Sequence, residues 1–164
     1  MFGTKVALIL GEKMKPQVDT MTGKRILIVE DERVVREGLR LLLSGDAHTV
    51  VEANNGAEAM ALFHQDRFDL VITDYEIPFI KGNELAAKIK RVAPQQPILM
   101  ITAYRHRPGP DNPVDALVMK PFVTSVLRGI IAKLLAQPGE LPTLSERAKV
   151  NLLSPSFETE IISV

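Results

Sequence analysis

Four short apolar runs, each followed at once by a polar side chain, constrain the fold of this chain more than any other feature. The runs are residues 26–29, 70–73, 98–101 and 116–119. The polar residues that follow them are Glu30, Asp31, Asp74, Thr102 and Lys120. Such runs, separated by helical patterns, are typical of buried parallel strands. Because parallel strands point their carboxyl ends to one edge of a sheet, we expect these five side chains to converge there.

Carboxylates that are crowded together repel one another, so at least one pKa should be raised unless a cation lies among them. Lys120 and a divalent metal are the two cations that the sequence suggests. Magnesium suits such a site, since it binds through a few carboxylates, keeps several waters and works beside phosphate.

The spacing of apolar residues predicts an alternation of strands and helices, which indicates an α/β fold. The expected strands are residues 25–29, 48–53, 69–73, 98–101 and 116–118. The expected helices are residues 32–44, 57–66, 83–92 and 124–135. Between the last two strands, three prolines and a glycine within residues 108–113 exclude a regular helix. We therefore expect a loop or a single turn there.

Four stretches resemble the receiver domain of two-component response regulators, of the single-domain type. They are residues 26–32, 69–78 together with Gly82, 97–103 and 120–122. The resemblance extends from about residue 24 to residue 135. It implies a doubly wound, five-stranded parallel sheet of flavodoxin-like order 2-1-3-4-5. In this chain the fourth helix of the family would be shortened or replaced by a loop.

The resemblance also implies roles for the polar residues. Asp74 would accept a phosphoryl group, Thr102 would hydrogen-bond a phosphate oxygen, and Lys120 would pair with another. The residues implied in Mg²⁺ binding are Glu30 (through a metal-bound water), Asp31, Asp74 and Glu76 (through its backbone carbonyl). The Lys120-Pro121 bond is usually cis in this family. The partners would be a sensor histidine kinase or a phosphotransfer protein, and a downstream protein target.

Ordinary structural roles remain open for each residue taken alone. Asp31 has the position of a helix cap, Asp74 that of a turn residue, and Lys120 that of a surface lysine. Two other functions are also open. One is a phosphatase of the haloacid-dehalogenase kind, which needs a second aspartate where this chain has Glu76. The other is an unphosphorylated pseudo-receiver that serves as an interaction module. As a receiver the chain would catalyse only its own phosphorylation and dephosphorylation.

Composition limits the partners. Lysine plus arginine and aspartate plus glutamate each number 20, so no net charge draws the chain to nucleic acid or a membrane surface. Cysteine is absent, and no apolar run reaches the roughly 20 residues that span a bilayer. We expect a cytoplasmic monomer or weak dimer that binds neither nucleic acid nor membrane. Its expected parts are a flexible extension (1–23), the receiver domain (24–136) and a tail (137–164). The tail can form a short helix but is too short for a DNA-binding output domain.

Overall fold

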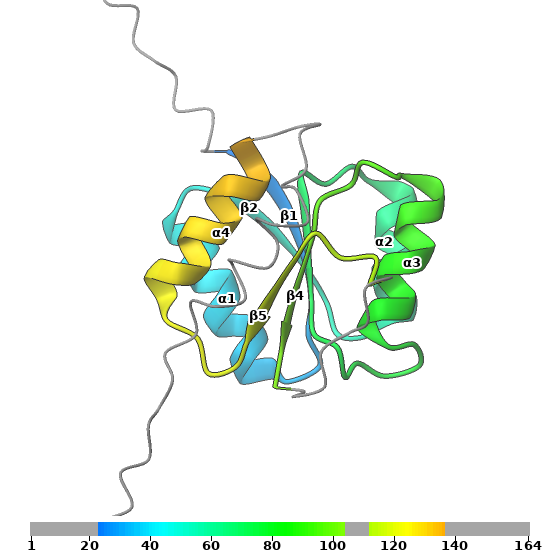
Figure 1. Ribbon diagram of the computed structural model, residues 1–164, viewed down its shortest axis with the longest axis horizontal. Helices are drawn as coiled ribbons and strands as arrows, with labels where there is room; N and C mark the ends of the chain where they lie inside the picture. The colour runs from blue at the N-terminus through cyan, green and yellow to red at the C-terminus, as the bar shows by residue number, and fades with distance from the viewer. Residues whose placement is uncertain (1–22, 104–111, 137–164) are drawn as a thin grey trace, which may run out of the picture.

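A parallel sheet with the strand order β2-β1-β3-β4-β5 lies at the centre of the molecule (Figure 1). The computed structural model describes residues 23–103 and 112–136. Its strands are β1 (Arg25–Val29), β2 (Thr49–Ala53), β3 (Leu70–Thr73), β4 (Ile98–Thr102) and β5 (Ala116–Met119). Its helices are α1 (Arg33–Gly45), α2 (Gly56–Gln65), α3 (Gly82–Val92) and α4 (Thr124–Ala136). The predicted fold class and strand order are confirmed.

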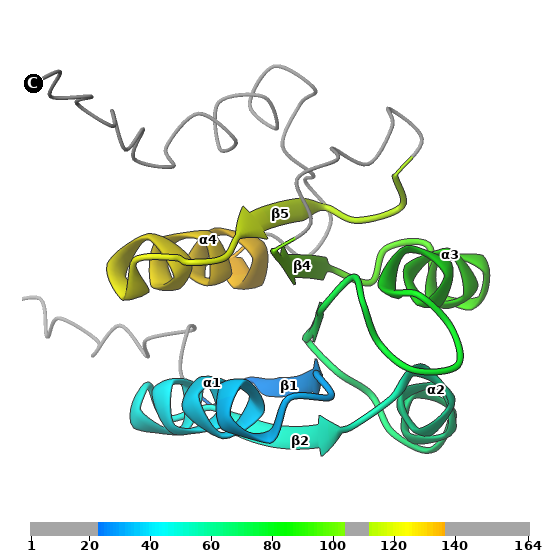
Figure 2. The ribbon, with the colours of Figure 1, turned by 90° about the horizontal axis from the view of Figure 1, so that it is seen from below.

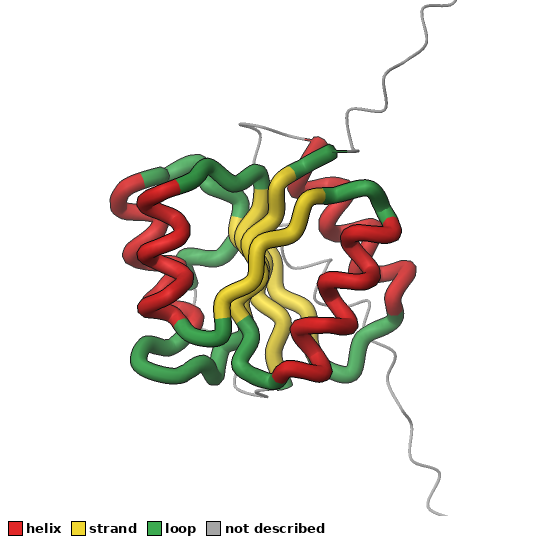
Figure 3. Tube along the Cα trace, turned by 180° about the vertical axis from the view of Figure 1, so that it is seen from behind, coloured by secondary structure: helices red, strands yellow, loops and turns green. Residues whose placement is uncertain are grey.

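The helices cover both faces of the sheet. Helices α1 and α4 pack on one face, and α2 and α3 pack on the other (Figure 2). Seen from behind, the strands form a twisted central layer between the two helical layers (Figure 3). Successive residues of β1 alternate between the two cores: Ile26 and Ile28 face α1 and α4, while Leu27 and Val29 face α2 and α3. A strand that is buried on both faces must be apolar throughout, which explains the uninterrupted apolar runs.

Local signals set where helices begin. Helix α2 starts with a side-chain cap. Asn55 Oδ1 accepts from the backbone N–H of Glu58 at 2.8 Å, and Glu58 Oε2 accepts from that of Asn54, the residue before the N-cap, at 2.9 Å. Helix α1 has no such cap, because no side-chain bond is made by its N-cap residue, Glu32. The interpretation of Asp31 as the cap of this helix is therefore wrong.

Every predicted strand and helix boundary within the described ranges lies within one residue of the observed one. Between β4 and β5, residues 112–115 are not helical, and most of the predicted loop, residues 104–111, lies outside the described residues. The expected extension and tail also lie outside them, apart from residue 23. Within residues 23–103 and 112–136, no helix is long and apolar enough to cross a membrane.

Candidate functional site

The carboxyl ends of four adjacent strands bring the predicted polar residues to one edge of the sheet. Strand β1 leads into Glu30 and Asp31, β3 into Asp74, and β5 into Lys120, while Thr102 is the last residue of β4. Backbone hydrogen bonds continue just past the strand ends: the Asp74 N–H donates to Val29 O at 3.0 Å, and the Lys120 N–H donates to Thr102 O at 2.8 Å. These bonds fix where each polar side chain leaves the sheet.

The Lys120 ammonium joins two of the carboxylates. Its Nζ donates to Glu30 Oε2 at 2.7 Å and to Asp74 Oδ2 at 2.8 Å. The side chains of Lys120, Glu30 and Asp74 are 16%, 2% and 10% exposed, so both ion pairs are largely shielded from water. Residues up to 90 positions apart are thus in direct contact, which confirms the predicted convergence for these three.

Burial and charge shift the protonation equilibria of this cluster. Burial raises the pKa of Glu30, and the nearby charge of Asp74 adds to this, although Lys120 acts in the opposite direction. Burial alone would lower the pKa of Lys120, but its hydrogen bonds to Asp74 and Glu30 outweigh burial and raise that pKa. The ion pairs therefore compensate the burial of Lys120 but not fully that of Glu30.

The turn after β3 holds Asp74 in place. The Tyr75 N–H donates to Asp74 Oδ1 at 2.5 Å, and the Thr73 hydroxyl donates to the Asp74 carbonyl at 2.8 Å. The Gly82 N–H donates to the Tyr75 carbonyl at 2.8 Å, which closes the loop at the start of α3. A Cβ on Gly82 would lie 2.0 Å from the Asp74 carbonyl oxygen, so only glycine fits there without a shift. The family resemblance included Gly82 but gave no physical reason for it.

The other predicted site residues, Thr102, Asp31 and Glu76, lie outside the ion pairs of Lys120. Thr102 is 2% exposed at the end of β4. The Asp31 carboxylate is exposed, and we find no hydrogen bond or ion pair to it within the described ranges. The Glu76 side chain is also exposed, and its carboxylate accepts from Lys81 Nζ at 3.0 and 3.2 Å. The Lys120-Pro121 peptide bond is cis.

Mg²⁺ matches the chemistry of these donors. Among residues 23–103 and 112–136, no group of three or more acidic or histidine side chains forms a metal cage by itself. Mg²⁺ does not require one, since it usually takes one or two carboxylates and retains several waters. An exposed carboxylate on Asp31 and a carboxylate on Asp74 at the same edge of the sheet supply that kind of incomplete oxygen shell.

Arg36 is a residue near the site that the sequence interpretation missed. Its Nη1 donates to the carbonyl oxygens of Glu30 at 2.6 Å and Asp31 at 3.3 Å. Its Nε lies 3.4 Å from Glu52 Oε1 on β2. An arginine one turn into a helix that follows an acidic loop is the only signal that the sequence offered.

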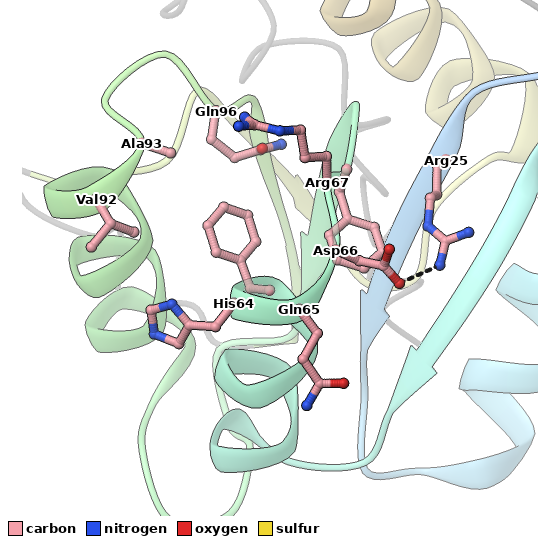
Figure 4. A pocket seen from close by; sticks show the side chains of 10 residues that line it. Arg25, His64, Gln65, Asp66, Arg67, Val92, Ala93 and Gln96 are labelled. Carbon is pink, nitrogen blue, oxygen red and sulfur yellow. Dashed lines mark hydrogen bonds and ion pairs between the residues drawn. The ribbon is translucent and has the colours of Figure 1, made fainter.

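A cavity of about 660 Å³ lies at the opposite edge of the sheet. It is bounded by Arg25 at the start of β1, Phe68 just before β3 and Val92 at the end of α3. In Figure 4 the Arg25 guanidinium points to the Asp66 carboxylate, and the two groups are 2.6 Å apart. The cavity therefore lies at the amino ends of the strands, away from Asp74, and is separate from the acidic site.

Comparison with known proteins identifies the family. The sequence profile of the response regulator receiver domain matches residues 26–132. The chain belongs to this family. It is a receiver domain homologous to phosphoacceptor regulators of two-component systems. The predicted identity is confirmed, and the matched residues include all four apolar runs and the polar residues that follow them.

Curated relatives share this domain. The response regulator MprA of Mycobacterium leprae (strain TN) is 36% identical over 115 residues, which cover 68% of this chain and 50% of that protein. The probable transcriptional regulator ycf27 of Guillardia theta is 31% identical over 146 residues, which cover 87% of this chain and 57% of that protein. The chain thus spans about half the length of the curated relatives that it matches.

Solved structures agree with the fold. The response regulator TrrA of Thermotoga maritima, in complex with Mg²⁺-BeF, is 37% identical, with a TM-score of 0.65 over 68% of this chain and 99% of that one. TrrA bound to the histidine kinase ThkA matches with a TM-score of 0.63 at the same identity, over 68% of this chain and 98% of that one. Receiver domains of this kind are signalling modules.

Proposed function

We propose that this receiver domain takes a phosphoryl group onto Asp74 from the phosphohistidine of a sensor histidine kinase or phosphotransfer protein. The observation that carries the proposal is the contact of Lys120 Nζ with both Glu30 and Asp74 at the carboxyl edge of the sheet. A partly buried ammonium next to an acidic nucleophile provides a positive charge where phosphate oxygens would lie. The TrrA structures, with a kinase and with Mg²⁺-BeF, support the same assignment by similarity.

Asp74 acts as the nucleophile. One of its carboxylate oxygens forms a bond to phosphorus while the bond from phosphorus to the histidine nitrogen breaks, and the imidazole keeps the electron pair. The orientation of the Asp74 carboxylate is set before the reaction, since the Tyr75 N–H binds Oδ1 and Lys120 Nζ binds Oδ2. Phosphoryl transfer needs mainly such positioning and charge neutralisation.

Lys120 and Thr102 receive the phosphoryl oxygens. Lys120 gives up its hydrogen bond to the Asp74 carboxylate and donates to a phosphoryl oxygen as a compact point charge. The Thr102 hydroxyl donates to another. Asp31, Asp74 and the backbone carbonyl of Glu76 would hold Mg²⁺, which would neutralise the remaining charge. Glu30, which is buried against Lys120, would hold a water of the metal rather than the metal itself.

The phosphatase alternative is disfavoured by the side chain at position 76. A phosphatase of that class needs an acid there that protonates the leaving group. Here the Glu76 carboxylate is bound to Lys81 and more than half exposed. A pseudo-receiver is disfavoured because the acidic residues and the lysine of the site are all present. Signalling through protein contacts with a downstream target follows from the receiver assignment.

Labelling with acetyl phosphate or beryllium fluoride in the presence of Mg²⁺ tests the proposal. We expect one acyl phosphate from acetyl phosphate, or one bound beryllium fluoride, on the wild type. We expect neither on Asp74→Asn, which keeps the shape of the side chain and the bond from Tyr75. Asp66→Asn, at the opposite edge of the sheet, is the matched control and should label normally. Label that persists on Asp74→Asn would identify another nucleophile. Rapid turnover without a retained label would favour the phosphatase, and no label on the wild type would favour the pseudo-receiver.

A further inference from the structure

The turn that carries Asp31 makes few hydrogen bonds of its own within the described residues. It joins β1 to α1, and the N-cap residue Glu32 makes no side-chain bond to the helix. The Glu32 N–H reaches only Glu30 Oε1, at 3.3 Å. Nothing binds the Asp31 carboxylate within the described ranges. The direction of that carboxylate therefore depends on the backbone beneath it.

Arg36 holds the backbone of this turn through two hydrogen bonds. Its Nη1 donates to two successive carbonyls of the turn, Glu30 O at 2.6 Å and Asp31 O at 3.3 Å. The side chain is 18% exposed, so these bonds are partly shielded from solvent. A planar guanidinium keeps several donors in a fixed fork, so Nη1 can bond the turn while Nε faces Glu52.

Glu52 on β2 anchors the other side of the guanidinium. Its Oε1 lies 3.4 Å from Arg36 Nε, and its Oε2 lies 3.6 Å from Arg40 Nε. Among the described strands, β2 is at the edge of the sheet and is hydrogen-bonded to β1 alone. A chain of contacts thus runs from the edge strand through Arg36 to the carbonyls on both sides of the Asp31 Cα.

We propose that Arg36, held by Glu52, is a positioning residue for Mg²⁺ binding at Asp31. The inference rests on the proposed function, in which Asp31 is a metal ligand. Mg²⁺ demands near-ideal octahedral geometry, so a small shift of the turn weakens its binding. Residues that orient metal ligands typically change metal affinity 10- to 100-fold when they are replaced.

Electrostatics alone predicts the opposite change in Mg²⁺ affinity when Arg36 is removed. Arg36 places a positive charge beside an acidic site that attracts a cation, so its removal should tighten Mg²⁺ binding on electrostatic grounds. If Arg36 acts by positioning, its removal should weaken binding. The sign of the change therefore separates the two roles, and a general loss of packing is measured separately as a change in the free energy of unfolding.

The test is a MgCl₂ titration, followed by calorimetry and by the amide NMR shifts of the site, at a temperature where every variant is folded. We expect Arg36→Met to weaken Mg²⁺ binding about 10-fold. Arg36→Lys keeps the charge without the fork and should recover part of the affinity. Arg40→Met is the matched control. Arg40 shares Glu52, and within residues 23–103 and 112–136 no hydrogen bond or ion pair joins it to the turn. The Mg²⁺ affinity of this variant should stay within about 2-fold of wild type.

Glu52→Gln offers an independent check if Arg36→Met does not fold. It weakens the anchor while Arg36 remains, and should lower Mg²⁺ affinity in the same direction but by less. Unchanged or tighter Mg²⁺ binding by Arg36→Met, with wild type binding normally, would overturn the positioning role and leave the proposed function standing. Failure of the wild type to bind Mg²⁺ would refute both.

Discussion

Replacing Gly82 with alanine should displace Asp74, because the first turn of α3 lies against the backbone of the β3–α3 loop. A Cβ at position 82 would lie 2.0 Å from the Asp74 carbonyl oxygen, 3.0 Å from its carbonyl carbon and 3.1 Å from the Tyr75 Cα. All three atoms belong to the backbone. They cannot rotate away as the end of a side chain can, so the loop or the helix must move.

The size of the effect follows from this geometry. Contacts of Cβ atoms shorter than 3.0 Å are essentially never seen, so the carbonyl must retreat by about 1 Å. Overpacking of this kind costs about 1–3 kcal/mol, and the better helix propensity of alanine returns at most about 1 kcal/mol. We expect a net loss of about 2 kcal/mol and a fall in Tm on the order of 10 °C. Beryllium fluoride binding should weaken as well, since Asp74 moves with its carbonyl.

Three other glycines provide controls for urea unfolding and beryllium fluoride titration. At Gly38 in α1 and Gly129 in α4, an added Cβ would have no neighbouring atom within 4 Å, so alanine there should stabilise by about 0.5–1 kcal/mol without changing binding. At Gly56 the added Cβ would lie 2.2 Å from Ile80 Cγ1, which belongs to a side chain that can turn away. Gly56→Ala should therefore cost less than Gly82→Ala.

A Gly82→Ala variant as stable as Gly129→Ala, with unchanged beryllium fluoride affinity, would refute the steric argument. A variant that loses stability but binds beryllium fluoride normally would show that the helix moves and Asp74 does not.

Two further predictions concern buried charge. We expect Lys120→Met to lower the free energy of unfolding by about 3 kcal/mol at pH 8 and by less at pH 5. The measurement is urea unfolding in the presence of a metal chelator. Burial already raises the pKa of Glu30, and removal of Lys120 should raise it further. The stability linked to a raised carboxyl pKa is present below the ordinary value of 4.5 and is lost as the pH rises through the folded pKa. At pH 5 the variant can therefore keep Glu30 protonated, whereas at pH 8 it must bury an unpaired charge. Asp115→Asn should cost about 2–4 kcal/mol, because Asp115 Oδ2 accepts from the Ile98 N–H and from Lys90 Nζ, each at 2.8 Å. A double-mutant cycle with Lys90→Met should give a coupling of at least about 1 kcal/mol, and additive effects would contradict the pairing.

The sheet and its carboxyl edge were predictable because they follow from local pattern and topology alone. An apolar run such as residues 26–29 specifies a buried strand wherever the strand lies, and parallel strands necessarily end together. The convergence of Lys120 with Glu30 and Asp74 therefore required no knowledge of side-chain contacts. The cap at the start of α2 is also visible in the sequence, as an asparagine three residues before Glu58.

Contacts that depend on how a helix is rotated against the sheet were not predictable in this way. Arg36 reaches the carbonyls of the turn only because α1 starts at Arg33 and turns that side chain back toward β1. Lys90 meets Asp115 from 25 residues away, at the amino edge of the sheet. In each case a charged residue in an ordinary helical pattern looks like part of a solvated surface until the packing is known.

The balance of charge at the carboxyl edge leaves the ionised site with an excess of negative charge that Lys120 does not neutralise. Glu30, Asp31 and Asp74 bring three carboxylates, and Lys120 returns one positive charge, so the ionised cluster keeps two negative charges. Part of this excess is relieved by the raised pKa of Glu30. A phosphoryl group on Asp74 would replace one negative charge with about two. Since Lys120 is already shared between two carboxylates, it cannot neutralise that increase alone. Under the proposed function, a divalent cation beside the exposed Asp31 carboxylate would supply the missing positive charge.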